Sequence, residues 1–237
     1  MKPLLIIATG VIPSKIHARL HDFPQHFRLG AGVPVDQVRT VRVFAGEALP
    51  TPQEVAGAFI TGSAAMLTDR PRWSENTAGW IRTAMDVQLP LFGVCYGHQL
   101  MAHALGGQVG ALQGGQEIGT HYITRQNKDD SGPVLDGLPM SFRAHLTHQQ
   151  SVLEAPPTAT ICAHSERDPH QLLIYADQAL STQFHPEFSV ALMKAYIELK
   201  RVAMVAEGQD PQAALAMVHP APWARRLLRK FAKYCLS

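Results

Sequence analysis

The stretch "LFGVCYGHQL", Leu91 to Leu100, sets a cysteine between two glycines, directly after an apolar run and directly before a helix-like segment. The five residues "GVCYG", 93–97, have the Gly-x-nucleophile-x-Gly spacing of a nucleophile elbow, with cysteine in the place of serine. Where a strand turns at once into a helix, the nucleophile's backbone is strained and side chains at the flanking glycine positions would clash. The stretch therefore predicts a strand, a sharp corner occupied by Cys95, and a helix.

A thiol at a helix N-terminus lies beside free N–H groups and the positive end of the helix dipole, which favour the thiolate. This help matters because a cysteine with an ordinary pKa of ~8.5 is only a few per cent thiolate at neutral pH. The helix is expected to run through "HQLMAHAL" and to end at Gly106-Gly107. Most lone cysteines are buried core residues, but the strand before Cys95 and the terminated helix after it favour a nucleophile.

Elsewhere in the sequence, short apolar runs predict the strands of a sheet that is mostly parallel and covered on both faces. These runs are Leu4–Ala8 and the segments that end at Phe44, Thr61 and Val94. A helical pattern over 72–87 lies between two of them, and this alternation indicates an α/β fold with helices flanking a central sheet. From 108 to about 183, short alternating runs predict further strands and hairpins against the parallel core, and helices follow Pro186.

A length of 237 residues suits one large domain, or one domain with an extension. We expect residues 1–189 to form the domain and residues 190–237 to form a helical extension packed on it. A helical projection of the last segment has an apolar side with Trp223, Leu227, Leu228, Phe231, Tyr234 and Cys235, and a basic side with Arg225, Arg226, Arg229, Lys230 and Lys233. A helix docked by its apolar face is favoured, and a partner-docking surface is the alternative.

Composition excludes several classes of function. A net charge of +2 with 17% charged residues argues against a nucleic-acid or membrane-surface protein. The apolar run at the start is too short for a signal peptide, no run approaches the roughly 18 residues of a membrane helix, and three cysteines are an odd number for a disulfide framework. A cytoplasmic protein is expected. No metal or cofactor is expected either, because His17, His21 and His26 lack further ligands and no Gly-x4-Gly-Lys loop occurs.

A thiolate needs a base, and the base needs an orienting group. The segment "STQFHPEFS" offers both, because His185 ends a predicted strand over 179–184 and Glu187 lies two residues on. Such a tripeptide taken alone is more often a surface turn. However, Cys95, Thr61-Gly62 and His185 all follow the carboxyl ends of predicted strands, where open α/β sheets place their active sites.

At these two motifs, "GVCYGHQL" and "QFHPEF", the chain resembles the class I glutamine amidotransferases, over roughly Pro3 to Ser189. The pattern is most similar to stand-alone, GMP-synthase-like members, and it implies flavodoxin-like layering. The resemblance also implies a Cys95–His185–Glu187 triad that hydrolyses the side-chain amide of glutamine. Cys95 would form a γ-glutamyl thioester, His185 would act as base and then acid, and glutamate and ammonia would be released.

The resemblance extends to substrate contacts. Gln99 and Gly62 match substrate-binding positions, and Glu117 and Gly119 in "GGQEIGTHY" are similar to the family's Glu-x-Gly segment. The family's oxyanion loop usually has Gly-Gly-Pro, whereas this chain has "TGSA" at 61–64. The main-chain N–H groups of Ser63 and Tyr96 can still form an oxyanion hole, since a main-chain donor does not depend on the side chain.

A second departure concerns the family's Ser-His-x-Asp segment, which here is "THQQ" at 147–150. The missing acid argues against a catalytic duty for His148. Three functions stay open: an amidotransferase glutaminase that supplies ammonia to a separate synthetase or acceptor, a free-standing γ-glutamyl peptide hydrolase, and a silent binding module. The complete Cys, His and Glu positions argue against the third. The oligomeric state is left open.

Overall fold

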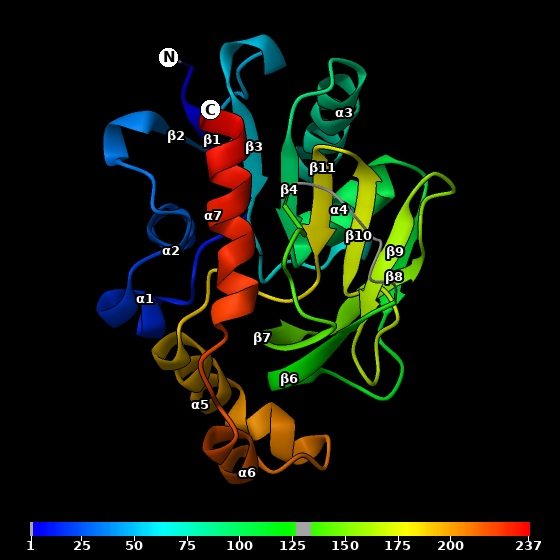
Figure 1. Ribbon diagram of the computed structural model, residues 1–237. Coiled ribbons are helices and arrows are strands. Elements are labelled where there is room, and N and C mark those ends of the chain that lie inside the picture. The colour runs from blue at the N-terminus through cyan, green and yellow to red at the C-terminus, as the bar shows by residue number, and fades with distance from the viewer. Residues whose placement is uncertain (1, 127–133) are drawn as a thin grey trace.

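The computed structural model describes residues 2–126 and 134–237, and within them a nine-stranded sheet forms the centre of the molecule (Figure 1). Its parallel half consists, in spatial order, of β2 (Val38–Arg42), β1 (Leu4–Ala8), β3 (Gly57–Ile60), β4 (Leu91–Val94) and β11 (Ala179–Thr182). The antiparallel half continues with β10 (Leu172–Ala176), β9 (Thr160–His164), β6 (Glu117–Arg125) and β7 (Ser141–His148). This mixed, layered sheet confirms the predicted α/β fold.

Helices cover both faces of the parallel strands (Figure 1). On one face lie α2 (Phe23–Ala31) and α7 (Pro222–Leu236), and on the other lie α3 (Arg72–Asp86) and α4 (Tyr96–Ala104). Strand β1 contributes side chains to the hydrophobic cores on both faces of the sheet, because alternate side chains of a strand point to opposite faces. Leu4 and Ile6 pack with α2 and α7, whereas Leu5 and Ile7 pack with α3 and α4.

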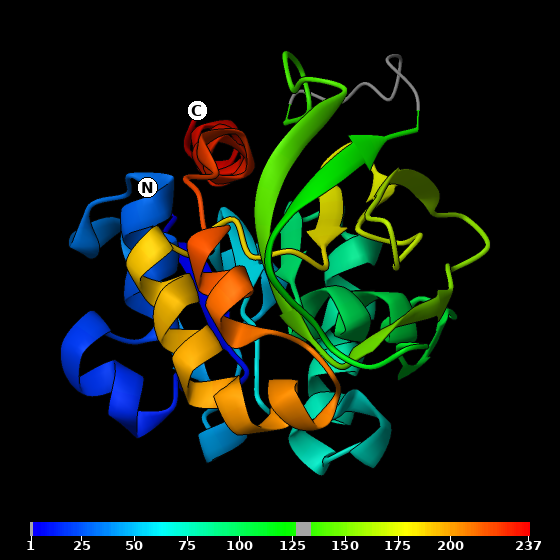
Figure 2. The ribbon, with the colours of Figure 1, turned by 90° about the horizontal axis from the view of Figure 1, so that it is seen from below.

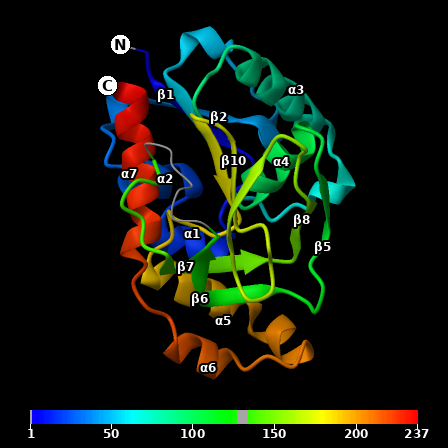
Figure 3. The ribbon, with the colours of Figure 1, turned by 45° about the vertical axis from the view of Figure 1, so that its right-hand side comes forward.

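A third group of helices lies at one end of the sheet. Figure 2, which views the molecule from below, shows α5 (Val190–Ala206) and α6 (Pro211–Ala216) nearest the viewer. With α1 (Ser14–Leu20) they form a separate apolar cluster that includes Ile16, Leu192 and Ile197. Figure 3 shows a two-stranded antiparallel sheet of β5 (Gln108–Ala111) and β8 (Gln150–Glu154) beside α4. Single 3-10 turns occupy Val35–Gln37, Val43–Ala45, Pro52–Glu54 and Leu67–Asp69.

The strand expected to end at Phe44 is shorter than predicted, because residues 43–45 form a 3-10 turn that Gly46 closes with φ 84°. The strand expected over 179–184 ends at Thr182. Among residues 2–126 and 134–237, no helix is both long enough and apolar enough to cross a bilayer.

The C-terminal helix α7 lies against the sheet by its apolar face. Leu227, Leu228 and Phe231 are buried in the core that also contains β1 and β3, and the Phe231 ring lies 5.0 Å from that of Phe59. Trp223 is 40% exposed instead of buried, and Arg226 lies over its ring. Because α7 shares the core of the sheet, we propose that residues 190–237 extend the domain formed by residues 1–189.

Candidate active site

Cys95 occupies a strained corner between β4 and α4. Its φ of 53° and ψ of −103° lie outside the ordinary regions for a residue with a side chain, and it is the N-cap residue of α4. A Cβ on Gly93 would lie 2.5 Å from the carbonyl oxygen of Gly97, and a Cβ on Gly97 would overlap the carbonyl oxygen of Ile60. Both glycines are therefore required by close backbone approach, as the spacing of the motif predicts.

Main-chain hydrogen bonds tie this corner to the strands on either side. The N–H of Cys95 donates to the carbonyl of Thr182 at 2.8 Å, and the N–H of Gly97 donates to the carbonyl of Thr61 at 3.1 Å. The corner is thus attached to the ends of both β11 and β3. These bonds hold the thiol at the carboxyl end of the parallel strands, next to the segment that carries His185.

His185 and Glu187 form a buried pair just beyond β11. Nδ1 of His185 lies 2.7 Å from Oε1 of Glu187, and the two side chains are 2% and 0% exposed. The main-chain N–H of His185 donates to the carbonyl of His145 at 2.8 Å, and its ring stacks on Phe188 with centroids 4.0 Å apart. The imidazole is therefore held by a carboxylate at one nitrogen, by an aromatic ring on one face and by a fixed backbone.

The electrostatics of this group favour the protonated imidazole. Burial by itself would lower the pKa of His185, but the Glu187 carboxylate and the sulfur of Cys95 outweigh burial and raise this pKa well above its usual value. Gly62 lies directly beside the pair, since a Cβ on it would be 3.1 Å from Cε1 of His185 and 3.6 Å from Cβ of Cys95. Thiol, imidazole and the loop after β3 therefore meet at one place.

A cavity of about 260 Å³ opens onto the thiol. Of the residues predicted for the site, it is lined by Ser63, Cys95, Tyr96, Gln99 and His185. Within the described residues, the main-chain N–H groups of Ser63 and Tyr96 donate to no acceptor. Two unused donors beside a buried thiol are what an oxyanion hole for that thiol would require.

The side chain of Gln99 has one end bound and one end open. Its Nε2 donates to the carbonyl of Gln150 at 2.8 Å and to Oε1 of Gln183 at 3.0 Å. Both of these bonds use Nε2, and within the described residues Oε1 accepts no hydrogen bond. A Gln side chain oriented in this way can offer its oxygen to an N–H group of a ligand in the cavity.

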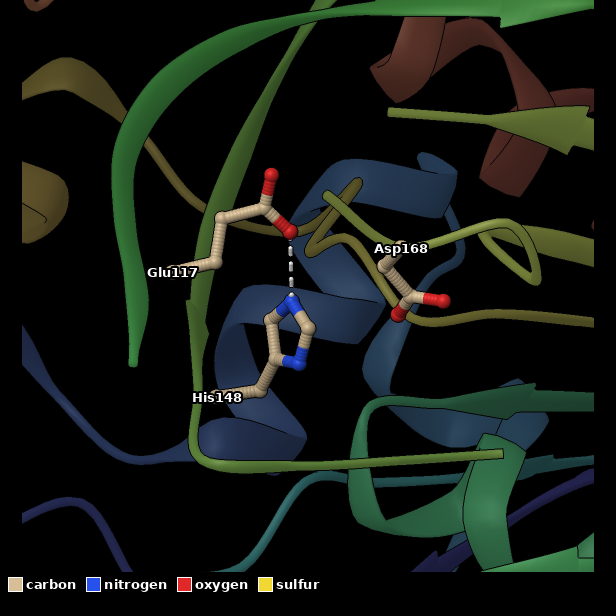
Figure 4. A group of neighbouring side chains, drawn as sticks. All are labelled: Glu117, His148 and Asp168. Atoms are coloured by element: carbon tan, nitrogen blue, oxygen red, sulfur yellow. Dashed lines mark hydrogen bonds and ion pairs between the residues drawn. The ribbon is translucent and has the colours of Figure 1, made fainter. Parts of the chain in front are cut away.

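Glu117 and Gly119, predicted as substrate contacts, are not among the residues that line the cavity. Figure 4 shows the Glu117 carboxylate pointing at the imidazole of His148, with Nε2 3.0 Å from Oε2. Burial would raise the pKa of Glu117, but the hydrogen bond from His148 and the charge of that ring outweigh this effect and lower the pKa. His148 does line the cavity, so Glu117 reaches the site through the His148 ring.

Asp168 completes a buried cluster with this pair (Figure 4), and in the described part of the chain this is the one group spaced to hold a metal ion. The two carboxylates of this cluster already accept hydrogen bonds from neighbouring side chains. Nε2 of Gln171 lies 3.2 Å from Oε2 of Glu117 and 3.4 Å from Oδ2 of Asp168, and Ser151 donates to the same Oδ2 at 2.6 Å. Amide and hydroxyl donors thus occupy the place of a cation, and we interpret the cluster as a hydrogen-bond network.

Sequence reasoning missed three further residues of the site. Gln150 holds the loop after Ser63, because its Oε1 accepts from the N–H of Leu67 at 2.8 Å and its Nε2 donates to Oγ1 of Thr68 at 2.7 Å. Tyr196 and Lys200 of α5 line the cavity. Their four-residue spacing could have been noticed, but it does not distinguish a site from an ordinary helix face.

Comparisons with known proteins identify the family of this chain. Residues 35–203 match the family model "Glutamine amidotransferase class-I". The chain therefore belongs to the class I glutamine amidotransferase family, which confirms the resemblance seen in its motifs. A crystal structure of a glutamine amidotransferase from Thermotoga maritima superposes with a TM-score of 0.78 at 19% identity, covering 100% of this chain and 99% of that one, and so shares the fold.

Two curated relatives are similar over part of their length. The chain is 41% identical over 99 residues to a glutamine-hydrolyzing GMP synthase subunit from Ignicoccus hospitalis, covering 41% of this chain and 50% of that protein. It is 27% identical over 144 residues to gamma-glutamyl peptidase 5 from Arabidopsis thaliana, covering 60% of this chain and 57% of that protein. The chain thus spans about half the length of these two relatives.

Proposed function

We propose that this chain hydrolyses the side-chain amide of glutamine through a γ-glutamyl thioester on Cys95, releasing glutamate and ammonia. One observation carries the proposal: a thiol at a helix N-terminus shares a cavity with His185, whose ring is paired with the buried Glu187 carboxylate. A nucleophile, its base and the group that orients the base are the three parts that acyl transfer requires.

In the first half-reaction, the Cys95 sulfur attacks the amide carbon while the His185 imidazolium protonates the departing nitrogen. The C–N bond breaks, ammonia leaves, and a C–S bond remains as the thioester. In the second half-reaction, His185 accepts a proton from water, the hydroxide oxygen attacks the thioester carbon, and the C–S bond breaks. Glu187 accepts a hydrogen bond from Nδ1 throughout, which stabilises the imidazolium and directs Nε2 to the thiol.

The oxygen of the scissile carbonyl becomes negatively charged in both tetrahedral intermediates. We assign its stabilisation to the main-chain N–H groups of Ser63 and Tyr96, with Gly62 giving the oxyanion loop room beside the imidazole. Gln99 is assigned to substrate binding through its open Oε1. Glu117 is assigned an indirect part in substrate binding, since it orients the cavity-lining His148.

A second candidate is the hydrolysis of γ-glutamyl peptides by the same thioester chemistry. It is supported by the likeness to gamma-glutamyl peptidase 5 and by the lysine that lines the cavity. A separate synthetase that receives the ammonia is the corresponding partner for the first candidate, supported by the likeness to the GMP synthase subunit.

The test is steady-state release of glutamate by the purified chain from glutamine and from a panel of γ-glutamyl peptides, with Cys95→Ala as the blank. We expect turnover by the isolated chain on at least one of these compounds. Losing one oxyanion donor typically costs about 10²–10³ in rate, so a misaligned loop would give near-silence. Rates equal to the blank on every compound would contradict independent hydrolysis and favour a chain that needs a partner, or a silent binding module.

A further inference from the structure

An unpaired lysine faces the cavity that contains the nucleophile. Helix α5 presents Tyr196 and Lys200 four residues apart on the same face, and both line the cavity with Cys95. Within the described residues, the Lys200 ammonium has no hydrogen-bond or ion-pair partner. The side chain is only partly exposed, so the cation is neither fully hydrated nor neutralised.

The rest of the cavity offers this cation no carboxylate. No Asp or Glu among the described residues lines the cavity, and Lys200 is its one Lys or Arg. Burial lowers the pKa of Lys200, while Cys95 and Glu207 act in the opposite direction. Glu207 is already bonded, because its Oε2 accepts from the N–H of Gln116 at 3.0 Å. A partly desolvated ammonium without a partner is unfavourable by itself and favours an anionic ligand.

The chemistry of the ligands indicates which anion fits. In free glutamine the carboxylate and the ammonium share one carbon, so a lysine that binds this carboxylate also meets a second cation nearby. In a γ-glutamyl dipeptide, the leaving amino acid carries a carboxylate without an ammonium, because its nitrogen is the scissile amide. The glutamyl arm can use the open Oε1 of Gln99 and the hydroxyl of Thr147, which has no hydrogen-bond partner in the described part of the chain.

We propose that Lys200 binds the carboxylate of the leaving amino acid, which makes it a residue that determines specificity for γ-glutamyl peptides. This proposal rests on the second candidate function, the hydrolysis of γ-glutamyl peptides, and it distinguishes these peptides from free glutamine, the substrate of the first candidate. The lysine lies outside both sequence motifs, on a helix that follows the His-Pro-Glu segment. The specificity is thus assigned to α5 and the chemistry to the ends of β4 and β11.

The test measures binding in the Cys95→Ala background, where no turnover occurs. Calorimetry would compare γ-glutamylalanine with γ-glutamylalaninamide, which differ by one carboxylate. We expect the acid to bind about tenfold or more tightly than the amide, which is the size of a charge-assisted hydrogen bond. Lys200→Met keeps the length of the side chain and should abolish this preference, whereas Lys200→Arg should retain most of it. Lys194→Met, an exposed lysine of the same helix, is the matched control and should keep the preference.

Equal affinities for acid and amide in the Cys95→Ala chain, or binding of neither compound, would overturn the assignment of Lys200. An equal loss of affinity for both compounds in Lys200→Met would also overturn the assignment, since it would show that Lys200 has a structural role. Tight, Lys200-dependent binding of the acid with no turnover by the unsubstituted chain would contradict the proposed hydrolysis and leave the assignment standing. The two proposals therefore fail separately.

Discussion

Nδ1 of His185 lies 2.7 Å from Oε1 of Glu187, and neither side chain has appreciable contact with solvent. This contact spans only two residues of chain, with Pro186 between them. It fixes the orientation of the ring, because Nδ1 donates its N–H to the carboxylate in both the protonated and the neutral imidazole. Nε2 is therefore left for the thiol, which is the arrangement that a general base for Cys95 requires.

The first prediction concerns which cysteine reacts. A chloroketone analogue of glutamine should label Cys95 and not Cys162 or Cys235. Cys162 is fully buried, and burial raises the pKa of Cys235 to about 12, so neither presents an accessible thiolate. Mass spectrometry of a digest would locate the adduct. Preferential labelling of Cys162 or Cys235 would refute Cys95 as the nucleophile.

The two partners of the thiol should differ in their effect on turnover. His185→Ala should lower kcat by on the order of 10³ or more, because it removes the proton acceptor. Glu187→Gln should lower it less, because the amide oxygen can still accept from Nδ1. Circular dichroism and thermal unfolding would verify that both variants fold. Equal losses would contradict this division of roles.

The protonation of His185 should depend on both neighbours. In wild type, NMR titration should give a His185 pKa well above the usual value, and Glu187→Gln should lower it more than Cys95→Ala does. Because the folded pKa exceeds the unfolded value of about 6.5, this group stabilises the fold fully below that pH. Its contribution is lost as pH rises through the folded pKa, since the unfolded chain then binds fewer protons than the native one. An unchanged pKa in Glu187→Gln would contradict the account.

Two glycines should respond oppositely to the same substitution. Gly97→Ala should reduce the free energy of unfolding by about 1–3 kcal/mol or more, because its Cβ would meet the carbonyl of Ile60. Gly79→Ala in α3 is the matched control. Its Cβ would lie no closer than 3.7 Å to any neighbour, so it should stabilise the helix by roughly 0.5–1 kcal/mol. Urea unfolding would measure both, and a neutral Gly97→Ala would contradict the close approach.

The last prediction concerns the loop that carries Ser63. Gln150→Ala should lower kcat about tenfold, less than the loss of a whole oxyanion donor, because it frees Leu67 and Thr68. Thr68→Val removes one of the two bonds and should cost less. Steady-state kinetics on whichever substrate is turned over would test the order. A larger loss in Thr68→Val than in Gln150→Ala would contradict the role of Gln150 in holding the loop.

Much of this protein could be predicted from local sequence. The elbow glycines, the apolar strands and the His-Pro-Glu segment each depend on contacts within a few residues or on the alternation of a strand, so the α/β fold and the Cys95 corner followed directly. The predicted strand boundaries were less accurate than the predicted order of strands and helices. The strand expected to reach Phe44 ends at Arg42, because a 3-10 turn competes there.

Tertiary structure alone decided which side chains reach the cavity. Glu117 matched a substrate-contact motif, yet β6 pairs with β7 in a register that sets it opposite His148, and its carboxylate bonds that ring. No sequence motif indicated that Lys200 belongs to the site. It lines the cavity only because α5, the helix that contains it, packs at the end of the sheet. Contacts between residues 80 or more apart, such as Leu67 with Gln150, depend on how whole elements pack. The residues proposed as nucleophile and base could therefore be singled out from local sequence, whereas the residues proposed to select the substrate emerged only from the packed chain.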